Sequence, residues 1–153
     1  MIIAAPVSDK SPTLQVQVSS RNPRKVWESL ASMDTSSVTR LLPPVPLDIT
    51  KSSTVATAFQ HADVVVSLVG IMYGSPQEFE EVQLKGAENV AHAAKEVGAK
   101  LIHFSAIGAD PSSSIPYSRT KGRAEQSIFT ISPDATVIRP SLVFGPEDDF
   151  FNV

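Results

Sequence analysis

Tyr117 and Lys121 lie four positions apart in a segment that reads as the first turns of a helix. Residues four apart share one face of a helix, so the phenol and the ammonium group can point at one spot. An ammonium group beside a phenol favours the phenolate, and we expect it to lower the pKa of Tyr117. Ser105, directly after the apolar run 101–104, supplies a second hydrogen-bond donor. Ser105, Tyr117 and Lys121 are therefore candidate catalytic residues for protonating a carbonyl group during its reduction.

The same spacing has an ordinary explanation, because a chain with two tyrosines and several lysines can place Tyr-x-x-x-Lys by chance. The serine one predicted strand earlier, together with its flanking residues, reduces the weight of that explanation. Both interpretations stay open when only these residues are considered.

Length and composition limit the classes of function. A chain of 153 residues, 42% apolar and 19% charged, fits one globular domain. A net charge of −3 without a dense basic cluster argues against nucleic-acid binding. The absence of cysteine excludes disulfides, thiolate metal sites and a cysteine nucleophile, and the longest apolar run, 64–72, is too short to span a bilayer. We predict no metal site, because the three histidines are scattered: His103 is expected in the core, His61 and His92 on the surface.

Strand-like and helix-like segments alternate along the chain. We predict strands at 14–18, 45–49, 64–69, 101–104 and 135–139, and helices at 23–30, 52–60, 77–97 and 116–129. Ser52 or Ser53 is expected to cap the second helix, and Gly98 to end the third. The run 64–69 is nearly all apolar, as in a central parallel strand covered on both faces. This order predicts an α/β fold with a doubly wound parallel sheet, in which ligands bind at the carboxyl ends of the strands.

Several motifs together resemble the extended and atypical short-chain dehydrogenase/reductases, an NAD(P)-binding Rossmann family. Tyr117-x-x-x-Lys121 with the upstream Ser105 is one of them, and the others are RPSLVFGP (139–146), DVVVSLVGI (63–71), GAENVA (86–91) and FGPEDDFFN (144–152). The last three are most similar to the branch that contains the nucleotide-binding accessory subunit of mitochondrial NADH:ubiquinone oxidoreductase (complex I). The resemblance covers about residues 14–152.

The resemblance implies that Arg21 pairs with the 2′-phosphate of NADP. A strand that ended in a carboxylate would instead suit the ribose hydroxyls of NAD, whereas this strand ends near Arg21, Arg24 and Lys25. The alternative for Arg21 is a solvated basic turn. The resemblance also places Asp48 beside the adenine, and the alternative for Asp48 is a turn or capping residue for the helix that follows.

By the same resemblance, Gly70 lets the cofactor approach the backbone, or else simply ends a strand with a turn. Lys121 would bind the nicotinamide ribose in addition to activating Tyr117. Pro140 and Ser141 would line the nicotinamide end of the site, with a purely structural turn as the alternative.

Two features of the family are missing from the sequence. The Gly-rich turn that follows the usual first strand is absent, since the first glycine is Gly70, and the family's C-terminal substrate region is absent too. Residues 1–153 therefore read as a partial NAD(P)-binding domain, incomplete without the usual first strand. Residues 2–7 could fill the vacant position, but only about six residues separate them from Leu14, so we expect antiparallel pairing. Weak or no dinucleotide binding follows.

The resemblance implies an NAD(P)H-binding accessory subunit of complex I with a structural role, present here as a fragment with impaired cofactor binding. The implied cofactor is NADP, with NAD as the alternative, and the implied partners are other complex I subunits. The implied location is the matrix side of the mitochondrial inner membrane, peripheral to the membrane without a span; no targeting signal is recognisable in the sequence. Two alternatives stay open: an NADP-dependent reductase or epimerase linked to ubiquinone synthesis and using Tyr117 and Lys121, and a non-functional fragment.

Overall fold

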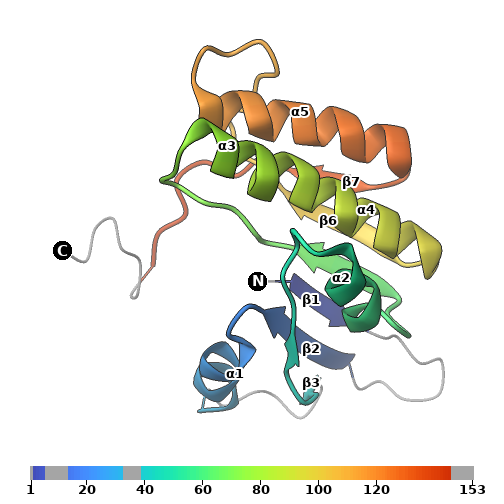
Figure 1. The fold of residues 1–153 in the computed structure, drawn as a ribbon. Coiled ribbons are helices and arrows are strands. Elements are labelled where there is room, and N and C mark those ends of the chain that lie inside the picture. Colours follow the sequence, from blue (N-terminus) through green and yellow to red (C-terminus); the bar gives the residue numbers. More distant parts are fainter. Residues whose placement is uncertain (1, 6–13, 33–38, 146–153) are drawn as a thin grey trace.

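The computed structural model describes residues 2–5, 14–32 and 39–145, which form one sheet with helices packed against it (Figure 1). The strand order is β3-β2-β1-β5-β6-β7, and β4 also pairs with β2. The strands are β1 (Ile2–Ala5), β2 (Leu14–Ser20), β3 (Thr39–Leu41), β4 (Val45–Pro46), β5 (Val64–Ser67), β6 (Lys100–Phe104) and β7 (Thr136–Ile138). The helices are α1 (Pro23–Ser32), α2 (Ser52–Ala58), α3 (Pro76–Phe79), the π-helical segment η1 (Glu80–Lys85), α4 (Gly86–Glu96) and α5 (Pro116–Ile131).

Strand β1 fills the position between β2 and β5 and runs antiparallel to both. Ile2 pairs with Ser19 and with Ser67, close to the carboxyl ends of those two strands. The predicted antiparallel pairing of this segment is therefore confirmed. The remaining neighbours, β2 with β3 and β4, β5 with β6, and β6 with β7, are parallel as predicted.

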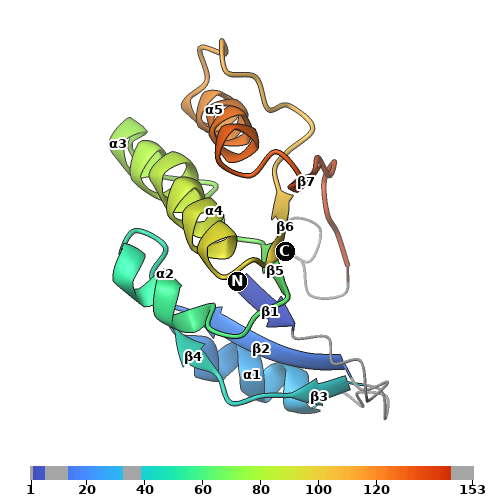
Figure 2. The same ribbon diagram turned by 90° about the vertical axis from the view of Figure 1, so that its right-hand side faces the viewer.

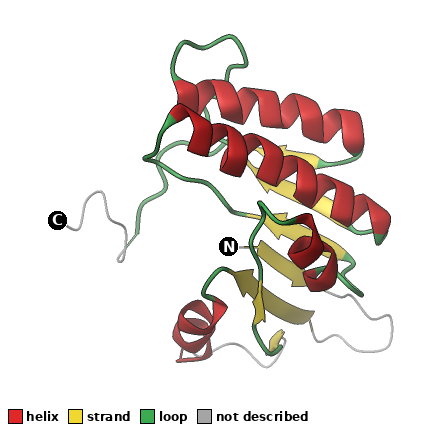
Figure 3. Ribbon diagram, in the orientation of Figure 1, coloured by secondary structure: helices red, strands yellow, loops and turns green. Residues whose placement is uncertain are grey.

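Helices lie on both faces of the sheet, which confirms the doubly wound α/β class (Figures 1 and 3). Gln17 of β2 points toward α2, because its side-chain amide donates to the Ala58 carbonyl at 2.9 Å. Its neighbour Val18 points to the opposite face and is fully buried, and α1 packs against β2. Helices α3, α4 and α5 lie together on the α2 side, as the turned view shows (Figure 2).

The hydrophobic core lies between the sheet and helices α2, α4 and α5. Val65 and Leu101 point into it from β5 and β6, against Val90 and Ala94 of α4 and Ile128 of α5. On the opposite face, Val64 and Val66 are only half-buried. The expectation that β5 is covered on both faces is therefore wrong for the part of the chain described here, since the helices next to β5 and β6 pack on the Val65 side.

Some helix ends carry the capping residues that the sequence predicts, and others do not. Ser75 and Glu78 form a reciprocal capping box at the start of α3, and Gly98, with φ of 72°, ends α4 as predicted. Ser52 and Ser53 do not cap α2, because both lie inside the helix and Lys51 occupies the N-cap position without a side-chain bond. Among the described residues, no helix combines the length and hydropathy needed to cross a bilayer.

Candidate functional site

A cleft of 270 Å³ opens at the carboxyl ends of β2, β4 and β5. It brings together three residues that were predicted from separate segments: Arg21, Asp48 and Gly70. The other lining residues are Ser20, Leu47, Ile49, Thr50, Leu68, Val69, Ile71 and Val82. Parallel strands end at one edge of a sheet, which is why segments so far apart in the sequence meet here.

Asp48 has two roles at the wall of this cleft. Its carboxylate accepts hydrogen bonds from the backbone N–H of Thr50 at 3.0 Å and from the Thr50 hydroxyl at 2.7 Å. These bonds lower the pKa of Asp48, with smaller contributions from the charges of Lys51 and Arg21. Asp48 is therefore a turn residue, which is the alternative that the sequence left open, and it also lines the cleft. Arg21, which lines the same cleft, is exposed.

Gly70 connects the cleft to Lys121. A Cβ atom added to Gly70 would lie 3.3 Å from the Lys121 amine nitrogen and 3.6 Å from the side-chain oxygen of Gln83. The Lys121 amine donates to the Phe104 carbonyl at 3.0 Å and is buried. A side chain at position 70 would therefore crowd the amine, so glycine keeps open the space between the cleft and Lys121.

The electrostatic prediction for Tyr117 is wrong. Tyr117 is half-buried, with its ring edge-on to Phe79 at a centroid distance of 6.2 Å, and burial raises the pKa of its phenol. Burial also lowers the pKa of Lys121 to about 8, although the charge of Glu125 acts in the opposite direction. The expected lowering by an ammonium does not appear, because the phenol is partly removed from water and burial disfavours its charged form.

A layer of polar side chains is buried between β6 and the helices η1 and α5. This buried polar layer consists of Gln83, His103, Ser105, Lys121 and Glu125, each at most 6% exposed. The Gln83 side-chain oxygen, both His103 ring nitrogens and the Ser105 hydroxyl have no hydrogen-bond partner among the described residues. Burial lowers the pKa of His103 to about 4, and the Lys121 charge contributes in the same direction.

Only part of this layer was predicted from the sequence. His103 was expected in the core and is 2% exposed, whereas His61 and His92 are exposed as predicted. Gln83 and Glu125 were missed. The sequence does carry a signal for both. Each lies at helical spacing on a helix face that also carries buried apolar residues, namely Val90, Ala124 and Ile128.

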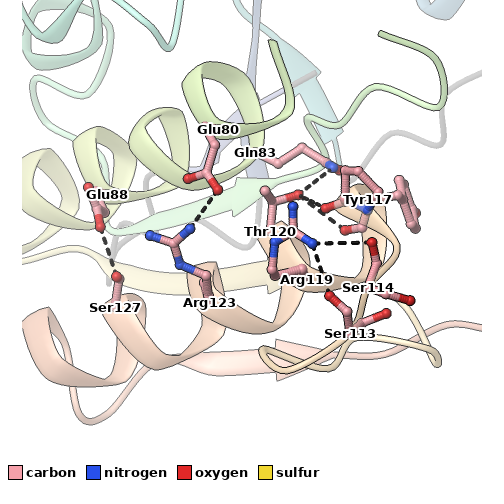
Figure 4. Close-up of polar contacts among 11 residues, drawn as sticks. Glu80, Gln83, Glu88, Ser113, Ser114, Tyr117, Arg119, Thr120, Arg123 and Ser127 are labelled. Atoms are coloured by element: carbon pink, nitrogen blue, oxygen red, sulfur yellow. Dashed lines mark hydrogen bonds and ion pairs between the residues drawn. The ribbon is translucent and has the colours of Figure 1, made fainter. Parts of the chain in front are cut away.

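Polar contacts with η1 and α4 fix the position of α5, and with it Tyr117 and Lys121 (Figure 4). Gln83 donates to the Thr120 hydroxyl at 3.1 Å, and the Thr120 hydroxyl donates to the Pro116 carbonyl. Arg123 pairs with Glu80 at 2.5 Å. Glu88 accepts from the Ser127 hydroxyl, and Arg119 donates to the Ser113 and Ser114 carbonyls.

The segment after β7 runs beside the segment after β6. Ser105 donates its backbone N–H to the Ile138 carbonyl at 2.8 Å, and Ile107 donates to the Pro140 carbonyl at 3.0 Å. Pro140 and Ser141 thus lie on the side of the sheet edge where Ser105 is found, rather than in the cleft with Arg21. Their contact with a nicotinamide stays a prediction, as do the catalytic roles of Ser105, Tyr117 and Lys121.

Comparison with known proteins identifies the family. The family model described as NAD(P)H-binding matches residues 8–148. The mitochondrial NADH-ubiquinone oxidoreductase 40 kDa subunit of Neurospora crassa is 37% identical over 106 residues, which is 68% of this chain and 28% of that protein. The mitochondrial NADH dehydrogenase (ubiquinone) 1 alpha subcomplex subunit 9 of Dictyostelium discoideum is 34% identical over 110 residues, 71% of this chain and 31% of that protein. The chain spans less than a third of the length of these curated relatives.

A solved structure supports the fold independently. The crystal structure of dTDP-4-dehydrorhamnose reductase from Bacillus anthracis in complex with NADP superimposes with a TM-score of 0.64 at 19% identity. The match covers 84% of this chain and 54% of that chain. These matches confirm the predicted resemblance to NAD(P)-binding proteins and to the complex I branch, and the solved structure supports the fold.

Proposed function

Because the chain belongs to the NAD(P)H-binding family, we propose that it forms the nucleotide-binding part of an accessory subunit of respiratory complex I. Its role there is structural, at the matrix side of the mitochondrial inner membrane and in contact with other complex I subunits. The observation that carries the proposal is that two mitochondrial complex I subunits match about two thirds of the chain.

The cleft suits one end of a dinucleotide. Arg21 supplies a guanidinium for a 2′-phosphate, which favours NADP over NAD, and Asp48 offers an acceptor beside it. Gly70 leaves room next to the Lys121 amine, whose two further protons can bind ribose hydroxyls. The nicotinamide cofactor supplies hydride chemistry when bound; the contribution of these residues is to bind and orient it.

The direction of the central strand β1 indicates that dinucleotide binding is weak. β1 runs antiparallel to β2, so the chain leaves β1 at the edge opposite to the cleft. A helix following β1 therefore cannot begin at the cleft, and its backbone N–H groups cannot receive a pyrophosphate there. We infer that the chain holds NADPH poorly, although Arg21, Asp48 and Gly70 line one cleft.

Calorimetric titration of the chain with NADPH tests this inference. We expect a dissociation constant well above the low-micromolar range, because β1 leads away from the cleft and so places no helix N-terminus there for the pyrophosphate. Low-micromolar affinity would contradict it.

The structural role has its own test. A tagged chain expressed in mitochondria is expected to co-migrate with complex I on native gels. A tagged variant with Tyr117→Phe should co-migrate equally, because the proposal assigns no catalytic duty to this phenol. Migration of the chain as a free species would overturn the assignment to complex I.

A second candidate function is an NADP-dependent reductase or epimerase. The observation in its favour is that Ser105 and Lys121 lie close together, since the Lys121 amine binds the carbonyl of the residue before Ser105, and Tyr117 lies one helical turn away on α5. A purely structural subunit has little need of such an arrangement. In this reading Tyr117 is the proton donor and Lys121 holds the ribose.

The two tyrosines of the chain provide a matched test of the enzymatic role. Tyr117→Phe should abolish NADPH-dependent carbonyl reduction, while Tyr73→Phe, at a residue 91% exposed, should leave it unchanged. Loss of turnover in the first variant with complex I assembly intact supports the enzyme. Equal turnover in both variants supports the structural role alone.

A further inference from the structure

The side-chain amide of Gln83 has a partner on one side and none on the other. Gln83 is 3% exposed, and its amide nitrogen donates to the Thr120 hydroxyl at 3.1 Å (Figure 4). The Thr120 hydroxyl donates its own proton to the carbonyls of Pro116 and Tyr117, at 2.8 and 3.1 Å. It can therefore only accept from Gln83, so the amide nitrogen must face Thr120 and the amide oxygen must face away from it.

That amide oxygen lies beside Gly70, next to the Lys121 amine. A Cβ atom built on Gly70 would lie 3.6 Å from Gln83 Oε1 and 3.3 Å from Lys121 Nζ, and both Gly70 and Val82 line the cleft. Gln83 Oε1 is buried and has no hydrogen-bond partner among the described residues. Lys121 Nζ donates to the Phe104 carbonyl at 3.0 Å, and an ammonium group has three protons to donate. An acceptor and a donor, each able to form a further hydrogen bond, thus lie together on one side of Gly70.

The chemistry of these two atoms limits what can bind between them. A buried carbonyl oxygen without a donor costs free energy, so a group that donates to it is favoured there. A phosphate or a carboxylate could accept from the amine but would repel the amide oxygen, and an apolar group would satisfy neither atom. A hydroxyl both donates and accepts, and two adjacent hydroxyls, as on a ribose, can each bind one of the two atoms.

We propose that Gln83 is a ligand-binding residue whose amide oxygen accepts a hydrogen bond from a ribose hydroxyl beside Gly70, while Lys121 donates to the same pair of hydroxyls. The proposal rests on the proposed function, in which a nicotinamide dinucleotide occupies the cleft. It adds a residue of η1 to the ribose site and requires hydroxyls, not an anionic group, at that point. Because Gly70 has no side chain, a ligand in the cleft can approach the amide oxygen from the Gly70 side.

A simpler role for Gln83 is to tie η1 to α5 through Thr120. That role uses only the amide nitrogen and leaves the buried oxygen without a purpose. It predicts that loss of either side chain of the pair has the same effect, because the same hydrogen bond is broken. The ligand-binding role predicts that loss of Gln83 has the larger effect on ribose binding, because only that change removes the oxygen.

The experiment is an NMR titration of the chain with methyl β-D-ribofuranoside, which carries the ribose hydroxyls but no phosphate and no base. We expect Gln83→Leu to raise the dissociation constant about fivefold, because one hydrogen bond to the sugar is lost. Thr120→Val keeps the amide oxygen and should raise it less. The matched control is Gln77→Leu, the same change at an exposed residue of α3 whose amide donates to Glu81, and it should bind the sugar as the unsubstituted chain does. An unchanged dissociation constant in Gln83→Leu, or an equal rise in Thr120→Val, overturns the proposal.

A second measurement keeps the proposal testable if Gln83→Leu does not fold. In the unsubstituted chain, the side-chain carbonyl ¹³C signal of Gln83 should move when the ribofuranoside is added, because its oxygen gains a donor. Tetrahydrofuran, the same ring without hydroxyls, should leave the signal in place. No movement with the sugar, or equal movement with tetrahydrofuran, overturns the proposal. Neither measurement involves the phosphates, the nicotinamide or complex I, so failure of NADPH to bind and failure of this proposal are distinguishable.

Discussion

The cleft and the buried polar layer lie at the same edge of the sheet but are built in opposite ways. In the cleft, charged groups such as Arg21 are exposed, and Asp48 already has partners in Thr50. In the buried polar layer, Lys121 and Glu125 are removed from water, and His103 and Ser105 have unpartnered polar atoms. Burying such groups without partners costs free energy, whereas exposed charges cost little.

The two regions also differ in what packs against their helices, which is backbone in one and a side chain in the other. Gly122, the chain neighbour of Lys121 of the layer, lies against the backbone of Asp110 and Pro111, whereas Gly86 of α4 lies against the side chain of Ile49, a cleft residue. Backbone cannot move aside as a side chain can. Sequence change should therefore be tolerated in the cleft and resisted in the layer, a difference that substitutions can test.

The largest effect is expected from adding a single methyl group to α5. In Gly122→Ala the new Cβ would lie 2.6 Å from the Asp110 carbonyl carbon, which forces α5 away from the loop, and we expect a loss of about 3 kcal/mol in unfolding free energy. In the matched Gly86→Ala the clash at 2.6 Å is with the end of the Ile49 side chain, and better helix propensity offsets part of it. Urea denaturation of both variants measures the difference; equal losses would remove the contrast.

The next effect concerns acid sensitivity. The pKa of His103 is about 4 in the folded chain and about 6.5 when unfolded, so the unfolded state binds more protons between these values. Stability is then lost as pH falls, by about 2 kcal/mol between pH 7 and pH 5. His103→Leu should remove that loss in urea denaturation at the two pH values. His92→Gln, at an exposed position, should retain it.

A smaller effect is expected at Lys121. Its folded pKa of about 8 lies below its unfolded value, so burial of the charge destabilises the fold at neutral pH and the penalty fades as pH rises above 8. Lys121→Met should therefore gain about 1–2 kcal/mol at pH 7, after allowing for the lost bond to the Phe104 carbonyl, and less at pH 9.5. Lys85→Met, at an exposed residue, is the control. A destabilised Lys121→Met would show that this bond outweighs the burial of charge.

The sequence predicted the helices and strands better than the burial and pKa shifts in and around the buried polar layer. Periodic apolar residues located α4, α5 and β6, and the short connection before Leu14 predicted the antiparallel β1, because both signals are local. The direction of the Tyr117 pKa shift could not be obtained in this way. It depends on the burial of the phenol, which is set by tertiary packing such as the contact with Phe79, 38 residues away in the chain. The π-helical segment η1, which carries Gln83, was missed for the same reason.

The smallest effect on stability is expected in the cleft, where function should change instead. Arg21→Gln removes an exposed charge, so the free energy of unfolding should change by less than about 0.5 kcal/mol. The ratio of NADPH to NADH affinity should fall about tenfold, because a charge-assisted bond to the 2′-phosphate is lost while contacts to the rest of the cofactor are kept. Arg24→Gln, an exposed charge on α1 that does not line the cleft, should leave the ratio unchanged. Competitive titration with both cofactors measures the ratio, and equal shifts in the two variants would mean that Arg21 contributes only to a general basic surface.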